Sequence, residues 1–230
     1  MIRSPASTPV PTREQRAHAA FRAFVADPRF PCLAGKGVMR GDGFRLRVYG
    51  ALGSARSAAR LGRDLAAFVG EAPAGRAGLQ SFVAVFPREA PADEGAFERR
   101  LWEQLQRLHE RDEPDVGWDP TVSADPEDPR FSFSFAGRAL FVVGMHPASS
   151  RLARRFRWPA LVFNPHAQFE RLRADGRFAP LRDAVREREI ALQGTLNPNL
   201  ADFGERSEAR QYSGRAVGAE WHCPFHGKAP

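Results

Sequence analysis

Residues 131–173 constrain the fold more than any other part of the chain. Phenylalanine and serine alternate over residues 131–135, a pattern that predicts a strand with one buried face and one face toward water. A three-residue connection, Ala136-Gly137-Arg138, leads to the unbroken apolar run of residues 140–143, which indicates a strand covered on both faces. The short connection predicts that the two strands pair as an antiparallel hairpin.

Two junctions that carry a histidine follow this hairpin. Gly144-Met145-His146-Pro147 comes after the first apolar run, and Asn164-Pro165-His166 comes after a second one. An arginine-rich, helix-like segment follows each junction. Strand-to-helix junctions often hold ligands in α/β folds, because helix N-terminal N–H groups point there. His146 and His166 are therefore candidate site residues, with a hydrogen-bonded junction residue as the equally weighted alternative.

The rest of the chain supplies further helices and strands. Apolar periodicity predicts helices over residues 12–26, 54–70, 94–111 and 178–192, and strands over residues 44–49 and 80–86. Pro31 disfavours helical backbone at Phe30, so Cys32 is expected in an extended loop. Residues 112–130 are acidic and proline-rich and predict a long loop.

These elements predict an α+β (mixed α/β) fold. We expect a single domain with a central, mostly antiparallel sheet, flanking helices and an irregular C-terminal wrap. The expected domain spans residues 12–226, with a disordered N-terminus at residues 1–11 and a tail at residues 227–230. No 20–50-residue repeat is present, and no linker divides the chain.

Charge, hydropathy and cysteine content make several classes of protein less favoured. The net charge of +7 comes almost entirely from arginines that are spread among acidic residues, which does not favour nucleic-acid binding. No apolar stretch approaches the 18 residues of a membrane span, and no signal-peptide pattern opens the chain, so a cytoplasmic protein is expected. Cys32 and Cys223 are too far apart in sequence for a zinc framework. Each is either an inert buried thiol or a ligand or nucleophile.

Some residues carry possible chemistry without a recognised motif. His109 lies near Trp102 on the helix of residues 94–111 and suits an iron ligand or a general acid–base group, although a satisfied core histidine is the more common case. The arginines at 151, 154, 155 and 157 could bind phosphates or carboxylates, or form a solvated surface. His222-Cys223-x-x-His226 lacks a fourth zinc ligand and indicates a structural zinc only weakly.

Several of these segments together resemble the YqcI/YcgG family. The resemblance rests on Phe30-Pro31-Cys32, on the helix end at residues 108–112, on Phe141-Val142-Val143-Gly144-x-His146-Pro147 and on Leu161-Val162-Phe163-Asn164-Pro165. The segment of residues 197–215 is similar to a branch that contains the haem-dependent guanidine N-hydroxylases of the guanitoxin and D-cycloserine pathways. The resemblance thus implies a haem-dependent N-hydroxylase, a monooxygenase that places a hydroxyl on a guanidine or amine nitrogen of arginine or a related amino acid.

The resemblance also implies roles for individual residues. Protohaem (haem b) would bind O₂ or peroxide, with an electron donor as partner. Cys32 is the first candidate for a thiolate ligand to the iron and Cys223 the second; among imidazoles His109 is favoured over His146 and His166. The other implied roles are Glu110 and His146 as catalytic groups, Arg154, Arg155 and Arg157 as partners of the haem propionates, and Asp202, Glu208 and Tyr212 as substrate-binding residues.

Three other functions compete with this one. A haem-binding or sensing protein without turnover would bind haem but consume no guanidine or amine. A hydrolase or transferase that uses Cys32 and a histidine would need no haem at all. A nucleic-acid module would bind in a strongly salt-dependent way. The sequence leaves the exact substrate and the oligomeric state open, a homodimer included.

Overall fold

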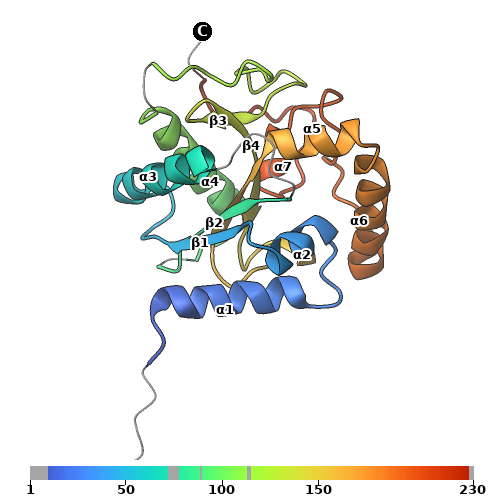
Figure 1. The fold of residues 1–230 in the computed structure, drawn as a ribbon, viewed down its shortest axis with the longest axis horizontal. Helices are drawn as coiled ribbons and strands as arrows, with labels where there is room; N and C mark the ends of the chain where they lie inside the picture. The colour runs from blue at the N-terminus through green and yellow to red at the C-terminus, as the bar shows by residue number, and fades with distance from the viewer. Residues whose placement is uncertain (1–9, 72–77, 89, 113–114, 228–230) are drawn as a thin grey trace, which may run out of the picture.

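The structure is a computed structural model that describes residues 10–71, 78–88, 90–112 and 115–227. Five strands form one sheet in the order β1-β2-β5-β4-β3 (Figure 1). The strands are β1 Phe44–Val48, β2 Ser81–Val85, β3 Phe133–Phe135, β4 Arg138–Met145 and β5 Ala160–Pro165. Only β1 and β2 pair in parallel, while the other three pairings are antiparallel. The predicted α+β class with a mostly antiparallel sheet is confirmed.

Helices cover both faces of this sheet. They are α1 Arg13–Ala26, α2 Leu33–Arg40, α3 Ala55–Glu71, α4 Glu94–His109, the short 3₁₀ helix η1 Leu152–Arg154, α5 His166–Ala174, α6 Phe178–Gln193 and α7 Ala209–Tyr212. α3 and α4 pack on one face, where Leu65 and Leu101 meet Phe163 in the larger core. α1 and α2 pack on the other face, where Phe21 and Val38 join the second core. Alternation along the strands explains the two cores, because successive side chains point to opposite faces.

The expected hairpin forms around a tight turn. β3 and β4 are joined by two residues, Ala136 and Gly137, rather than by three, and both have positive φ (50° and 68°). This conformation matches the twist of a two-residue hairpin. The carboxylate of Asp112 accepts a hydrogen bond from the Ala136 N–H and helps to hold the turn.

Other local predictions were wrong in instructive ways. Ser132 and Ser134 do not face water, because both are buried. The Asp119 N–H, from the long loop before β3, donates to the Ser134 hydroxyl, and Ser132 lies beside the buried Glu208. Cys32 does not lie in an extended loop but caps α2, which begins at the next residue. Pro31 excludes helix only before itself. After His146 the chain makes turns and the short η1 instead of a full helix.

The irregular C-terminal wrap is present over residues 194–227, with α7 as its one helix in the described part of the chain. It is fixed by hydrogen bonds: the Asn197 side chain donates to the Gly214 carbonyl, and Asn199 donates to Val217. None of the described helices is long and apolar enough to cross a membrane. Residues 1–9 of the expected disordered N-terminus and residues 228–230 of the tail lie outside the described residues.

Candidate functional site

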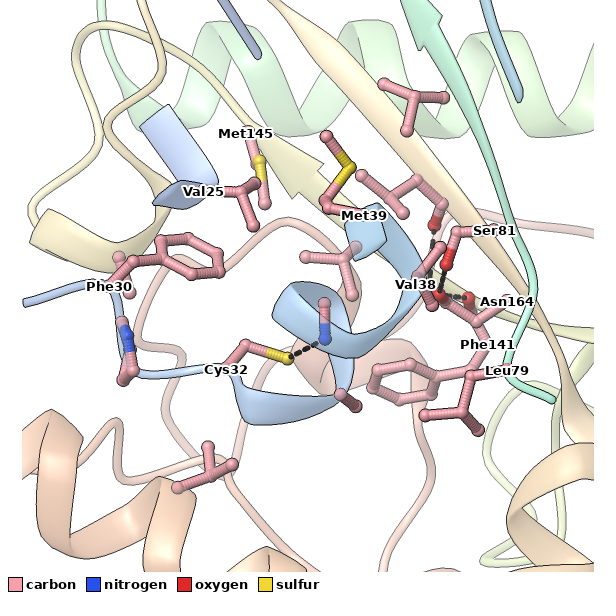
Figure 2. Close-up of a pocket in the computed structure, with 18 of the residues that line it drawn as sticks. Val25, Phe30, Cys32, Val38, Met39, Leu79, Ser81, Phe141, Met145 and Asn164 are labelled. Carbon is pink, nitrogen blue, oxygen red and sulfur yellow. Dashed lines mark hydrogen bonds between the residues drawn. The ribbon is translucent and has the colours of Figure 1, made fainter. Parts of the chain in front are cut away.

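A cleft lies on the sheet face that carries α1 and α2 (Figure 2). It lies beside the contacts of α2 with α6 and of α6 with α5, helices whose arrangement Figure 1 shows. One part, the apolar chamber, has a volume of about 270 Å³. Its walls include the side chains of Phe30, Val38, Met39, Phe141, Val143 and Met145. An adjoining part, the charged chamber, has about 220 Å³ and is lined by α5, α6 and the chain that follows them.

Cys32 lies where the two chambers meet and lines both. Its thiol caps the N-terminus of α2 and accepts a hydrogen bond from the Gly35 N–H at 3.3 Å (Figure 2). Burial raises the pKa of this thiol, while the backbone N–H groups and the cation of Arg154 act in the opposite direction. The thiol of Cys32 therefore carries a proton when no metal is bound to it. A metal ligated by this sulfur would displace that proton.

Polar groups in the apolar chamber mostly satisfy one another. The Ser81 hydroxyl donates to Oδ1 of Asn164 at 2.6 Å, and Nδ2 of Asn164 donates to the Phe141 carbonyl. Arg154 is the cation in this wall, and its guanidinium donates to the Tyr212 carbonyl at 3.0 Å. Burial lowers the pKa of Arg154 to about 10, so it stays charged at neutral pH. Among the described residues, the chamber thus combines apolar walls with the thiol of Cys32, the cation of Arg154 and the carboxylate of Glu189.

Most charges of the second chamber are already paired. Asp202 accepts hydrogen bonds from both Arg182 and Arg186. Glu189, on the wall that both chambers share, forms an ion pair with Arg151 at 2.6 Å. Asp202, predicted to bind a cationic substrate, is therefore held by two cations of the protein itself.

Glu208 is the exception among these carboxylates. Its side chain is 7% exposed and lines the charged chamber, and among the described residues no lysine or arginine lies within ion-pair distance of it. The Tyr212 hydroxyl donates to Oε2 of Glu208 at 3.3 Å, and Nδ1 of His166 lies 3.7 Å from Oε1. Burial raises the pKa of Glu208 to about 8, so this carboxyl is largely protonated at neutral pH.

Several predicted site residues lie on the other face of the sheet. His109 packs between the rings of Trp118 and Phe225, and Glu110 is exposed at the end of α4. His146 stacks on Phe97 with ring centroids 4.2 Å apart. Its burial lowers its pKa to about 4, and neither ring nitrogen has a hydrogen-bond partner in the described part of the chain.

Cys223 also belongs to the larger core, where burial raises the pKa of its thiol to about 12. Both cysteines are free thiols. His222 is exposed, and no group of three His, Cys, Asp or Glu residues is arranged to hold a metal among the residues described.

The remaining predicted residues lie near the cleft without lining it. Tyr212 is fully buried, and its hydroxyl also accepts from the Phe133 N–H. Arg155 donates to the Ser149 carbonyl, and Arg157 lies over the Trp158 ring, so Arg154 is the member of this group whose side chain reaches the apolar chamber. His166 sits behind the charged chamber, where its ring meets Phe203.

The sequence reasoning missed most of the charged wall. Arg173 on α5 and Arg182 and Arg186 on α6 line the chamber but were not singled out. The available signal was spacing, because Phe169 and Arg173 are four residues apart, as are Arg182 and Arg186, and residues so spaced share one helix face. What that face meets depends on how α5 and α6 pack, which spacing does not determine.

Comparison with known proteins identifies a matching family and two similar proteins. The model of the YqcI/YcgG family matches residues 21–226. The uncharacterized protein YcgG of Bacillus subtilis (strain 168) is 28% identical over 194 residues, which cover 80% of this chain and 75% of YcgG. The uncharacterized protein YqcI of the same organism is 26% identical over 193 residues, with the same two coverages. No solved structure matches this chain significantly.

Proposed function

This chain belongs to the YqcI/YcgG family, and from that premise we propose that it is a haem-dependent monooxygenase that N-hydroxylates a guanidine or amine. The proposal comes from the resemblance of residues 197–215 to the guanidine N-hydroxylase branch of the family. The observation that carries it is the position of Cys32. Among the five candidate ligands, Cys32 is the one whose side chain lines the cleft, in the parts of the chain that the structure describes.

The chemistry of the cleft suits a haem. Cofactor-sized pockets range over roughly 300–1,000 Å³ and are mostly apolar with a few polar groups. Each chamber alone, at about 270 and 220 Å³, is smaller than this, so a haem would span both. Cys32 would supply a thiolate ligand from an apolar wall. Arg154 or the arginines of the charged chamber would pair with the propionates. A thiolate-ligated haem supplies oxygen activation, because the thiolate pushes electron density toward iron and favours O–O cleavage.

Protein groups around the cleft would then position the substrate. A guanidinium or ammonium group needs a carboxylate partner that is not already neutralised. Asp202 is paired with two arginines, and Tyr212 is buried behind the chamber wall. Glu208 is therefore the favoured anchor. A cation that binds beside it would lower the pKa of the carboxyl, which would then release its proton and pair with the cation as a carboxylate. O₂ or peroxide and an electron donor complete the reaction.

Titration with hemin tests this function. Wild-type protein, Cys32→Ser and Cys223→Ser are each titrated while the absorbance of bound haem is followed. We expect wild type and Cys223→Ser to bind one equivalent and Cys32→Ser to bind at least tenfold more weakly. Loaded wild type, given arginine with an oxidant and reductant, should form a product heavier by one oxygen atom.

Three results would count against the proposal. Failure of both wild type and Cys223→Ser to bind hemin would remove the haem. Tight haem binding with no consumption of any guanidine or amine would leave a haem-binding or sensing protein instead of an enzyme. Unchanged haem binding and absorbance in Cys32→Ser would exclude Cys32 as the ligand.

A further inference from the structure

Three ionisable side chains form a line from the charged chamber to the surface. Glu208 lines the chamber, and its Oε1 lies 3.7 Å from Nδ1 of His166. On the other side of the same ring, Nε2 of His166 lies 3.1 Å from Oε1 of Glu170, one turn further along α5. The two inner side chains are buried, whereas the Glu170 side chain is 49% exposed. The imidazole thus bridges a buried carboxyl and a carboxylate in contact with solvent.

The ring nitrogen of His166 that faces Glu208 lacks a hydrogen bond within the part of the chain that the structure describes. Nδ1 of His166 is buried and has no hydrogen-bond partner among the described residues. The ring cannot swing away freely, because Phe203 packs against it at 4.5 Å between centroids. A buried ring nitrogen without a partner normally costs stability. At 3.7 Å from Oε1 of Glu208, this nitrogen can share a proton with the carboxyl when the gap closes, or through a water molecule.

Nearby charges leave the line able to carry a proton. The groups that face it are Arg173, which pairs with Glu170, Asp119 from the loop before β3, and the Tyr212 hydroxyl from α7. Burial lowers the pKa of His166, so its ring is neutral at neutral pH, and burial raises the pKa of Glu208 to about 8. A neutral imidazole next to a protonated carboxyl can accept at one nitrogen and donate from the other.

We propose that Glu208, His166 and Glu170 form a proton path that connects the charged chamber with solvent. Glu208 gives its proton to an acceptor in the chamber and becomes a carboxylate. The Glu170 carboxylate takes up a proton from water and gives it to Nε2 of His166, while Nδ1 of the ring passes its proton to Oε1 of Glu208. The same steps in reverse carry the proton of Glu208 to solvent and restore the first tautomer, and neither direction leaves a net charge on the path.

The path has a purpose that rests on the proposed function. Reduction of O₂ consumes protons, and a cleft filled by a cofactor and a substrate needs a route that delivers them. The path itself does not require haem, because its end group is a protein carboxyl. A failure of haem binding and a failure of the path are therefore separate results.

Infrared spectroscopy of the full chain tests the path without any cofactor. The carbonyl band of a protonated carboxyl that is lost in Glu208→Gln reports the proton on Glu208. After a rapid jump from pH 6 to pH 9, the decay of this band measures how fast that proton leaves. We expect at least tenfold slower decay in His166→Gln and severalfold slower decay in Glu170→Gln.

The control is Glu103→Gln, which removes another helix-surface glutamate that pairs with arginine, far from the cleft on α4. Its decay should match the wild type. Should His166→Gln fail to fold, the exposed Glu170→Gln variant carries the test alone. Decay at the wild-type rate in Glu170→Gln, or the absence of a band assigned to Glu208, would overturn the proposal.

Discussion

Replacement of Glu208 by glutamine tests the energetics of the cleft most sharply. Burial raises the pKa of Glu208 from 4.5 to about 8 in the folded protein. Between these two pH values the folded state binds a proton that the unfolded state has released, so the free energy of unfolding falls as pH rises. A shift of this size corresponds to at most about 4–5 kcal/mol between pH 4.5 and 8, and relaxation around the carboxylate reduces the loss to about 2–4 kcal/mol.

Glutamine has nearly the shape of glutamic acid but cannot ionise. We therefore expect Glu208→Gln to lack this loss. The free energy of unfolding of the variant should rise relative to that of the wild type by about 2–4 kcal/mol as pH rises from 5 to 8.5. Urea unfolding of both proteins at a series of pH values measures it, and the difference between the two curves cancels all other titrating groups. Glu103→Gln serves as the control. Parallel curves for wild type and Glu208→Gln would refute the inference that this carboxyl is buried without a cation.

Three further predictions concern residues outside the Glu208 cluster. Gly144→Ala would place a Cβ 2.6 Å from the Phe97 ring, and thermal unfolding should show a loss of stability of about 1–3 kcal/mol. The control Gly70→Ala has open space around it in α3 and should be neutral or stabilising by up to about 1 kcal/mol. Equal losses of stability in the two variants would contradict this packing. The pKa of His146 is lowered to about 4, so the unfolded state binds more protons between pH 4 and 6.5 and stability falls as pH drops through this window. His146→Phe should remove up to about 3 kcal/mol of that loss in acid unfolding curves, and an unchanged acid slope would show that the imidazole is not buried neutral. Asp202→Asn breaks partly exposed ion pairs with Arg182 and Arg186 and should cost less than about 1 kcal/mol in urea. A larger loss would mean that the pairs hold the chamber wall together.

Much of the fold follows from the sequence because local patterns determined it. The capping box of Thr12 and Gln15 marks the start of α1, and the periodic leucines of α4 mark its buried face. The sheet strands are apolar runs whose alternation separates the two cores. Burial of Ser132 and Ser134 could not be predicted, since it arises from segments distant in sequence: Asp119 contacts Ser134, and Glu208 lies beside Ser132.

The site was harder to predict, because the cleft depends on tertiary packing. Cys32 was singled out because the family resemblance implies a shared loop around it, but no local pattern indicated that the thiol caps a helix. His109 and Cys223 have suitable chemistry and lie in the core of the opposite face. Glu208 was one of three candidate carboxylate or phenol groups, and only the surrounding arginines distinguish it from Asp202.

The absorption spectrum of the reduced, CO-bound protein tests the central claim most directly. The account predicts that wild-type protein loaded with hemin gives the band position of a thiolate-ligated haem and that Cys32→Ser loses this position, while Cys223→Ser keeps it. An imidazole-type spectrum in the wild type, or a thiolate-type spectrum that survives in Cys32→Ser, would contradict the assignment of the cleft as the haem site.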